Sequence, residues 1–88
     1  MADKTQPREG RRTTINRPEY DSLRAVLRAC VQASGLSQRE VSLGLGRGEE
    51  YLNRILVGRR TLEWIELIEL CRAIGVEPLD VLTRALKP

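Results

Sequence analysis

The chain has 88 residues, of which 41% are hydrophobic and 31% are charged, and its formal net charge is +3. A chain of this length buries one small core, which excludes a multi-domain protein. It contains no His, one Trp, two Tyr and no Phe. Without His it lacks the commonest general base and the commonest metal ligand, which disfavours most enzymes. With so few aromatic residues it also lacks a platform on which single-stranded bases stack, which disfavours RNA-binding sheets.

The apolar segments are too short for a membrane protein. The longest run, Leu62–Leu70, is interrupted by three glutamates, whereas a bilayer span needs about 20 apolar residues. The first residues are basic but lack the apolar stretch of a secretory signal, so we expect a cytosolic protein. Cys30 and Cys71 fall on helical apolar stripes, and without His or a CxxC pair they cannot complete a zinc shell. We expect free core thiols, no metal and no cofactor.

Positive charge is concentrated in the first two thirds of the chain. Residues 1–60 carry twelve basic and seven acidic side chains, and residues 61–88 carry three and five. Residues 1–17 contain few large aliphatic side chains and are predicted to be disordered in isolation, while residues 18–88 form the domain. Two interpretations of residues 1–17 stay open: a solvated terminus, or a basic arm that lies on a nucleic-acid backbone or in a minor groove. The candidate arm contacts are Arg8, Arg11, Arg12 and Arg17.

From Pro18 onward, apolar residues recur with helical spacing. Pro18 suits a first helical turn and Gly35 a helix end; between them the predicted inward positions are Tyr20, Leu23, Leu27, Cys30, Val31 and Ser34. Ser37 and Glu40 have the spacing of a capping box, so they predict the start of a short second helix that buries Val41 and Leu45 and ends near Gly46.

Three further helices follow. The third is predicted from Glu49 to Leu56, with Leu52 and Ile55 or Leu56 buried and a polar outer face, and Gly58-Arg59-Arg60 closes it. The fourth has a predicted inward stripe of Trp64, Leu67, Ile68, Cys71 and Ile74 and ends at Gly75, and Pro78 opens a fifth with Leu79 and Leu82 inward. No segment alternates with period two, so the fold class is predicted to be all-α.

The second and third predicted helices, joined by a tight turn with glycine, form a helix-turn-helix candidate. The spacing of several anchors between residues 23 and 82 resembles the phage-repressor and Cro type, or Xre-like, helix-turn-helix family: Gly35-Leu36-Ser37-Gln38, Val41, Leu45-Gly46, Leu52, Ile55, Gly58-Arg59-Arg60 and Ala73-Ile74-Gly75-Val76. The resemblance implies a compact five-helix lambda-repressor-like domain. Its third helix would dock in the major groove of double-stranded DNA, usually as a homodimer on a palindromic operator.

The resemblance also implies which residues would contact DNA. The positions that match base contacts are Gly48, Glu49, Glu50, Asn53 and Arg54, and those that match phosphate contacts are Gln38, Gly58, Arg59 and Arg60, with Arg47 well placed to join them. The family commonly has a bridging Arg–Glu pair where this chain has Val31 and Leu56, so these two side chains are predicted to meet as an apolar pair.

Simpler interpretations of the same residues stay open. Glu49 and Glu50 would stabilise the first turn of the third helix through its dipole, and Glu50 would pair with Arg54 one turn later. Gln38, Asn53 and Arg59-Arg60 would be ordinary solvated residues. Two carboxylates that face DNA weaken binding unless one accepts a hydrogen bond from a cytosine or adenine amino group.

The favoured function is a sequence-specific transcriptional regulator, a repressor acting as a homodimer. The alternative is a protein-interaction module of the same fold, which would hold a toxin or a larger regulator with weak DNA recognition. An enzyme is disfavoured because no nucleophile–base pair, phosphate-binding loop or metal set is found. Apolar residues in excess of the inward faces of the last two helices predict the dimer surface: Ile65, Val81, Ala85 and Leu86. The alternative is that they are scattered apolar residues on the surface of a monomer.

Overall fold

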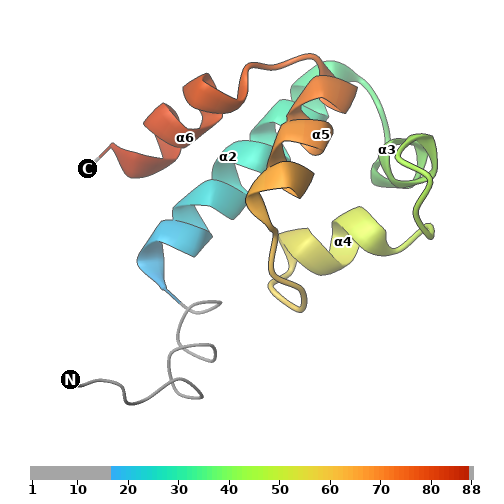
Figure 1. The fold of residues 1–88 in the computed structure, drawn as a ribbon, viewed down its shortest axis with the longest axis horizontal. Coiled ribbons are helices and arrows are strands. Elements are labelled where there is room, and N and C mark those ends of the chain that lie inside the picture. Colours follow the sequence, from blue (N-terminus) through green and yellow to red (C-terminus); the bar gives the residue numbers. More distant parts are fainter. Residues whose placement is uncertain (1–16, 88) are drawn as a thin grey trace.

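The computed structural model describes residues 17–87, and within this range it contains five α-helices and no strand. The helices are α2 (Pro18–Ser34), α3 (Gln38–Gly44), α4 (Tyr51–Leu56), α5 (Trp64–Ile74) and α6 (Pro78–Leu86) (Figure 1). The prediction of an all-α fold is confirmed. Helix α2 lies along α6 and also contacts α4 and α5, while α3 packs on α4 and α5. The predicted arm residues Arg8, Arg11 and Arg12 lie outside the described residues, and Arg17 is exposed at the start of α2.

The helix ends follow from local sequence. Gly35 and Gly75 end α2 and α5 in the left-handed conformation, with φ of 78° and 79°, which glycine adopts without a Cβ clash. The predicted capping box begins α3, where the Ser37 amide donates to Glu40 Oε1 at 2.8 Å and the Glu40 amide donates to Ser37 Oγ at 3.0 Å. Because these bonds satisfy free amides of the first turn, a seven-residue helix has a defined start.

The core brings together apolar side chains from all five described helices. Val31 and Leu56 both belong to it, with 4% and 2% of their surface exposed, so both are buried as the register requires, and their direct contact stays a prediction. Cys30 and Cys71 are free and buried, as predicted. Burial, with smaller contributions from Cys30 and Glu77, raises the pKa of the Cys71 thiol to about 11.

The inward faces of α5 and α6 differ from the prediction. Trp64 and Leu79 were expected to be buried, but they are 70% and 73% exposed. Leu70, Val81 and Ala85 are buried instead. Residues two positions apart on a helix lie roughly 160° apart around its axis, so α6 cannot bury both Leu79 and Val81. Contact with α2 selects the face that carries Val81 and Ala85.

This choice of face changes the predicted dimer surface. Val81 and Ala85 were expected to exceed the needs of the monomer core, and that expectation is wrong because the protomer buries both itself. Ile65 and Leu86 are exposed. Of the four predicted dimer residues, only Ile65 and Leu86 therefore lie on the surface of the folded chain.

Candidate nucleic-acid interface

A buried serine fixes the geometry between the two helices of the motif, α3 and α4. Ser42 is fully buried; its Oγ donates to the Gln38 carbonyl at 2.8 Å and accepts the Leu52 amide at 3.0 Å. The first amides of any helix lack partners inside that helix. Since no side chain caps α4 at its own N-cap, Glu50, the hydroxyl from α3 satisfies a buried amide of α4. The sequence does not predict this role, because capping signals lie at the start of their own helix, whereas Ser42 lies inside α3 and caps α4.

Glu49 and Glu50 were predicted in the first turn of the third helix, and this prediction is wrong. Both lie in the turn before Tyr51, where α4 begins, with Glu50 as its N-cap residue. Glu49 Oε1 accepts a hydrogen bond from Arg39 Nε at 3.2 Å, and Glu50 Oε1 accepts one from Asn53 Nδ2 at 3.4 Å. Within residues 17–87 the predicted ion pair between Glu50 and Arg54 does not form.

These contacts bring several predicted site residues together around a shallow hollow. Gln38 from α3 lines it with Glu49, Glu50 and Asn53, and Arg39 completes the lining. Arg39 was not predicted, although its place directly after Gln38 on the first turn of α3 was a usable signal. The Arg39 cation partly neutralises Glu49, whereas Glu50 accepts only from the neutral amide of Asn53 and keeps its charge.

The segment after α4 turns back over the end of that helix. The amides of Arg59 and Arg60 both donate to the Arg54 carbonyl, at 2.8 and 3.2 Å. Gly58 has a φ of +85°, a left-handed conformation that residues with a Cβ rarely adopt, so this turn favours glycine. From α2, Arg28 Nη2 donates to the Leu56 carbonyl at 2.7 Å, and the Tyr20 hydroxyl is hydrogen-bonded to the backbone of Leu62. The loop is therefore held at both ends.

Arg54 and Arg59 present exposed side chains on this surface. Within residues 17–87, neither guanidinium forms a hydrogen bond or ion pair. Arg54 projects from α4 itself and Arg59 from the turn after it. Of the predicted arginines in α4 and the turns on both sides of it, these two stay available to an external anion.

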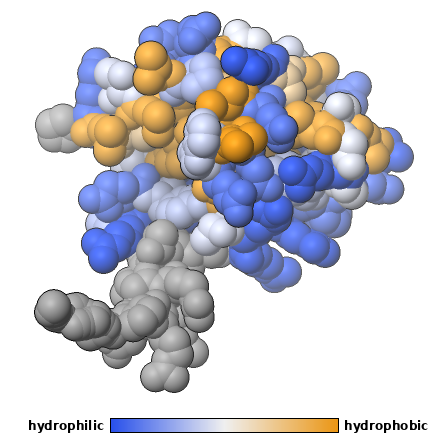
Figure 2. Space-filling view, in the orientation of Figure 1, coloured by the Kyte–Doolittle hydropathy of each residue, from blue (hydrophilic) through white to orange (hydrophobic). Residues whose placement is uncertain are grey.

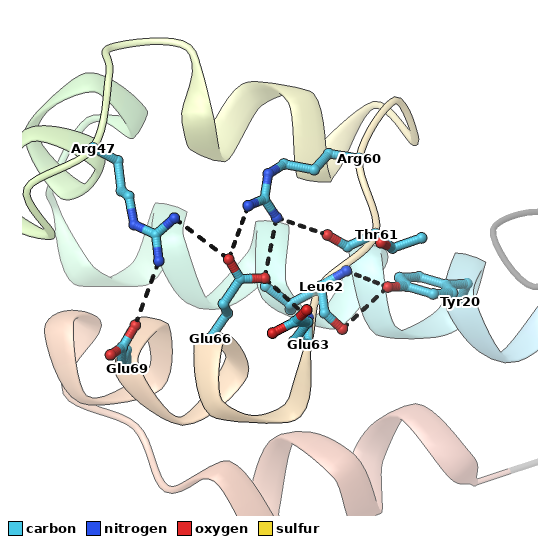
Figure 3. A network of polar contacts seen from close by, with 8 residues as sticks. All are labelled: Tyr20, Arg47, Arg60, Thr61, Leu62, Glu63, Glu66 and Glu69. Carbon is cyan, nitrogen blue, oxygen red and sulfur yellow. Dashed lines mark hydrogen bonds and ion pairs between the residues drawn. The ribbon is translucent and has the colours of Figure 1, made fainter.

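Arg47 and Arg60, by contrast, point to a glutamate on α5 (Figure 3). Arg60 Nη1 and Nη2 donate to the two carboxylate oxygens of Glu66 at 3.0 and 2.9 Å, and Arg47 Nη1 lies 3.5 Å from Glu66 Oε2. Both guanidinium carbons also lie over the Tyr51 ring, 4.7 Å from its centroid for Arg47 and 4.9 Å for Arg60. Each guanidinium therefore already has a carboxylate partner, and the phosphate contacts of Arg47 and Arg60 stay a prediction.

Glu66 belongs to the core side of this network. It is buried, and its Oε1 also accepts the Glu63 amide at 3.0 Å, so it takes part in the capping box of α5. Burial by itself raises its pKa, but the hydrogen bonds from Arg60 and the Glu63 amide, with the charge of Arg60, outweigh burial and hold the pKa of Glu66 below 4.5. In the sequence, Glu66 was identified only as an interruption of an apolar run. Its spacing from Glu63 was the missed signal.

Tyr51 sits between these charges and is itself buried. Burial and the negative charge of Glu66 raise the pKa of the Tyr51 hydroxyl above 10, against the opposing effect of Arg47. The phenol therefore stays protonated at neutral pH. A hollow on the surface of α4 is lined by Tyr51 together with Arg47, Gly48, Glu49, Glu50, Arg54 and Arg60.

The surface of α5 and α6 is apolar, in contrast to the charged surface around α4. Figure 2 shows hydrophobic side chains gathered over α6, and a hydrophilic region over the part of the molecule that carries α4. Exposed large apolar residues include Trp64, Ile65, Leu79 and Leu86. A mostly apolar groove runs between the two helices, lined by Trp64, Leu67, Ile68, Pro78, Leu79 and Leu82, with Arg72 and Glu77 at its edge.

Neither a membrane span nor a metal-binding cluster is found in the part of the chain that the structure describes. Among residues 17–87, no helix is both long enough and apolar enough to cross a membrane. Over the same range, no group of three or more His, Cys, Asp or Glu side chains could hold a metal ion.

Comparison with known proteins identifies the family. A protein-family model described as a helix-turn-helix domain matches residues 22–86. The chain belongs to the helix-turn-helix family. No curated protein matches it at a significant level. The matched segment contains α3, α4 and the turns on both sides of α4.

Solved structures place this helix-turn-helix protein among Xre-like folds. It is similar to an XRE-family like protein from Pseudomonas syringae pv. tomato str. DC3000, with 30% identity, a TM-score of 0.76, and 83% of this chain and 89% of that chain covered. It is also similar to the clp gene regulator ClgR from C. glutamicum, with 28% identity, a TM-score of 0.69, and 76% and 86% covered. The predicted resemblance is confirmed, and it supports a general function as a DNA-binding transcriptional regulator.

Proposed function

We propose that this helix-turn-helix protein is a sequence-specific repressor that binds a palindromic operator in double-stranded DNA as a homodimer. The observation that carries the proposal is the pair Arg54 and Arg59. Arg54 projects from α4 and Arg59 from the turn after it, and neither guanidinium has a partner among residues 17–87, while Arg39, Arg47 and Arg60 each pair with a glutamate. An exposed, unpaired arginine on the second helix of such a motif suits contact with DNA.

The two arginines have different proposed roles. Arg54 lies on the outer face of α4, where a guanidinium can donate to O6 and N7 of a guanine. Arg59 lies in the turn beyond α4, beside the groove, where a phosphate would meet it. Asn53, Glu49, Glu50 and Gly48 complete the proposed base-contacting surface, and Gln38, Gly58, Arg47 and Arg60 the proposed phosphate-contacting one.

Alanine substitutions separate these roles. Arg54→Ala should weaken binding to the best operator by about 1–3 kcal/mol and change binding to random duplexes little. Arg59→Ala should weaken both alike and reduce the slope of log K against log salt by about 0.9. Arg72→Ala is the matched control, since it removes the same charge from an exposed site on α5. Operators selected from random duplexes provide the substrate, and equal losses for Arg54→Ala on operator and random DNA would contradict base contact.

Glu50 provides a second, independent test. If its carboxylate accepts a hydrogen bond from a cytosine amino group, Glu50→Gln should relax preference at one base pair of the selected operator. If it only repels phosphates, the same substitution should tighten binding to every duplex. Comparison of selected sequences for the two proteins distinguishes these results.

The proposed homodimer would cover the exposed apolar side chains of α5 and α6. Ile65 and Leu86 remain from the predicted set, and Trp64 and Leu79 extend the surface. A two-fold dimer would have to place its two copies of α4 about 34 Å apart to reach successive major grooves. Leu86→Asp should leave the helical content unchanged and convert the dimer to monomer in sedimentation. A wild-type protein that stays monomeric at high micromolar concentration, with and without DNA, would refute the dimer.

Two predictions from the sequence stay part of the proposal. Residues 1–17 would act as a basic arm on the DNA backbone, and the protein would act in the cytoplasm at the nucleoid. Removing residues 1–16 should then lower affinity for all duplexes and reduce the salt slope. An unchanged slope would favour the solvated terminus.

The apolar groove between α5 and α6 favours a second candidate function, a protein-interaction module with weak DNA recognition. Trp64 and Leu79 expose large apolar surfaces beside it, and such patches mark interaction sites. Wild-type protein that binds no duplex even at low salt would favour this function over the repressor.

A further inference from the structure

The network around Glu66 leaves one edge of Arg60 unused. A guanidinium carries five N–H donors. Arg60 Nη1 donates to Glu66 Oε1 and to the Thr61 carbonyl, both at 3.0 Å, and Nη2 donates once, to Glu66 Oε2 at 2.9 Å. The two remaining donors are on Nε and Nη2, which are neighbours on the same edge of the planar group. Within residues 17–87 neither has an acceptor.

This free edge belongs to a side chain that is held in place. The Glu66 carboxylate fixes the end of the guanidinium, the Tyr51 ring lies 4.9 Å from its central carbon, and the Thr61 carbonyl accepts a third donor. A long, flexible arginine side chain normally loses rotamer entropy when it is immobilised. Here the fold has already restricted the Arg60 side chain, so the binding of an anion to its free edge costs less side-chain entropy.

Arg47 is held by the same carboxylate from the other end of α4. Its Nη1 lies 3.5 Å from Glu66 Oε2 and its guanidinium lies over Tyr51. Side chains of Arg47 and Arg60 are 37% and 36% exposed, and both line the hollow on α4 that also contains Arg54. One buried glutamate therefore positions two cations at the two ends of α4.

We propose that Glu66 is a positioning residue for DNA binding, which holds Arg47 and Arg60 so that the free Nε/Nη2 edge of Arg60 grips a DNA phosphate through two hydrogen bonds. This inference rests on the proposed DNA-binding function. It adds that an acidic residue strengthens the binding of a polyanion, which is the opposite of its direct electrostatic effect. Paired, planar donors on one edge match the geometry of phosphate oxygens.

The opposite signs make the proposal testable with Glu66→Gln. Loss of a negative charge near DNA should by itself tighten binding, because it lowers repulsion. If Glu66 positions the arginines, the same substitution should instead weaken binding to the selected operator and to random duplexes by about tenfold. The salt slope should fall by about 0.9 for each phosphate that the variant no longer neutralises. Asp80→Asn is the matched control: Asp80 is exposed on α6 and forms no ion pair within residues 17–87, so its replacement should leave binding unchanged or slightly tighter.

A second variant covers the case in which Glu66→Gln does not fold, as judged by far-ultraviolet circular dichroism. Arg60→Lys keeps the charge but removes the planar pair of donors. It should weaken DNA binding by about fivefold if the free edge grips a phosphate, and change it little if Arg60 acts only as a charge. Where Glu66→Gln does fold, it should cause no further loss in an Arg47→Ala/Arg60→Ala background.

The outcomes separate this proposal from the function on which it rests. If wild-type protein binds no duplex, the repressor proposal fails and takes this one with it. If wild-type protein binds DNA and folded Glu66→Gln binds equally or more tightly, only the positioning role is refuted. Unchanged binding by Arg60→Lys refutes the phosphate grip in the same way.

Discussion

Replacing Ser42 with alanine tests the hydrogen bond that joins α3 to α4. The Ser42 hydroxyl accepts the amide of Leu52 at 3.0 Å, and both residues are fully buried. Alanine is close to serine in volume, so the substitution removes the acceptor without opening a large cavity. The Leu52 amide would then stay buried without a partner, because the first amides of α4 have none inside the helix.

The expected loss follows from that single unsatisfied amide. Leaving a buried donor without an acceptor costs about 1–3 kcal/mol. We therefore expect Ser42→Ala to lower the free energy of unfolding by about 2 kcal/mol. For a domain of this size, this corresponds to a fall of roughly 8–16 °C in the unfolding midpoint.

Urea and thermal unfolding followed by far-ultraviolet circular dichroism measure this loss. Trp64 is a poor fluorescent reporter of the core because it is exposed. Thr83→Ala is the matched control: Thr83 Oγ1 donates to the Leu79 carbonyl at 2.7 Å, as Ser42 does to Gln38, but it is exposed. The control should stay within about 0.5 kcal/mol of wild type. If Ser42→Ala were no less stable than Thr83→Ala, the hydroxyl would not be what satisfies α4.

Three other predictions concern the core and its charges. Cys71 should resist alkylation at pH 8 in the folded protein and react after unfolding in urea, because its pKa of about 11 and its burial keep it as an inaccessible thiol; rapid labelling of the native protein would contradict this. Val81→Ala should lower the free energy of unfolding by about 1–3 kcal/mol, whereas Leu79→Ala should change it by less than about 0.5 kcal/mol. Equal effects of the two substitutions in urea unfolding would show that α6 buries a different face. The pKa of folded Glu66 lies below its ordinary value of 4.5, so its stabilising contribution is present above about pH 4.5 and is lost as the pH falls through the folded-state pKa. Glu66→Gln should therefore lose less stability on acidification than wild type, as measured by unfolding midpoints across that pH range.

Local sequence was sufficient for the helix boundaries because the signals act over a few residues. Pro18, the Ser37–Glu40 box, Gly35 and Gly75 each set backbone geometry or satisfy backbone donors within one turn. The spacing of apolar anchors also gave the family and the burial of Val31 and Leu56, since the same positions must meet in any chain of that fold. The exception was the start of α4, where Gly48, Glu49 and Glu50 carry no strong cap.

Helix faces were harder to predict at the end of the chain. In α6, the sequence offers two apolar faces, one with Leu79 and Leu82 and one with Val81 and Ala85. Hydrophobic spacing within nine residues cannot rank them. The choice depends on which face meets α2, a helix more than forty residues earlier in the sequence.

The candidate site shows the same division. The sequence by itself determined which residues surround the helix-turn-helix, because that set follows from the spacing of the motif. Only the tertiary structure decided which of its arginines stay available, since Arg47 and Arg60 find their carboxylate partner on α5 while Arg54 and Arg59 have none within residues 17–87. The physical reason is that a charge is paired or free according to what lies within about 4 Å of it. That distance is set by the packing of helices far apart in the chain.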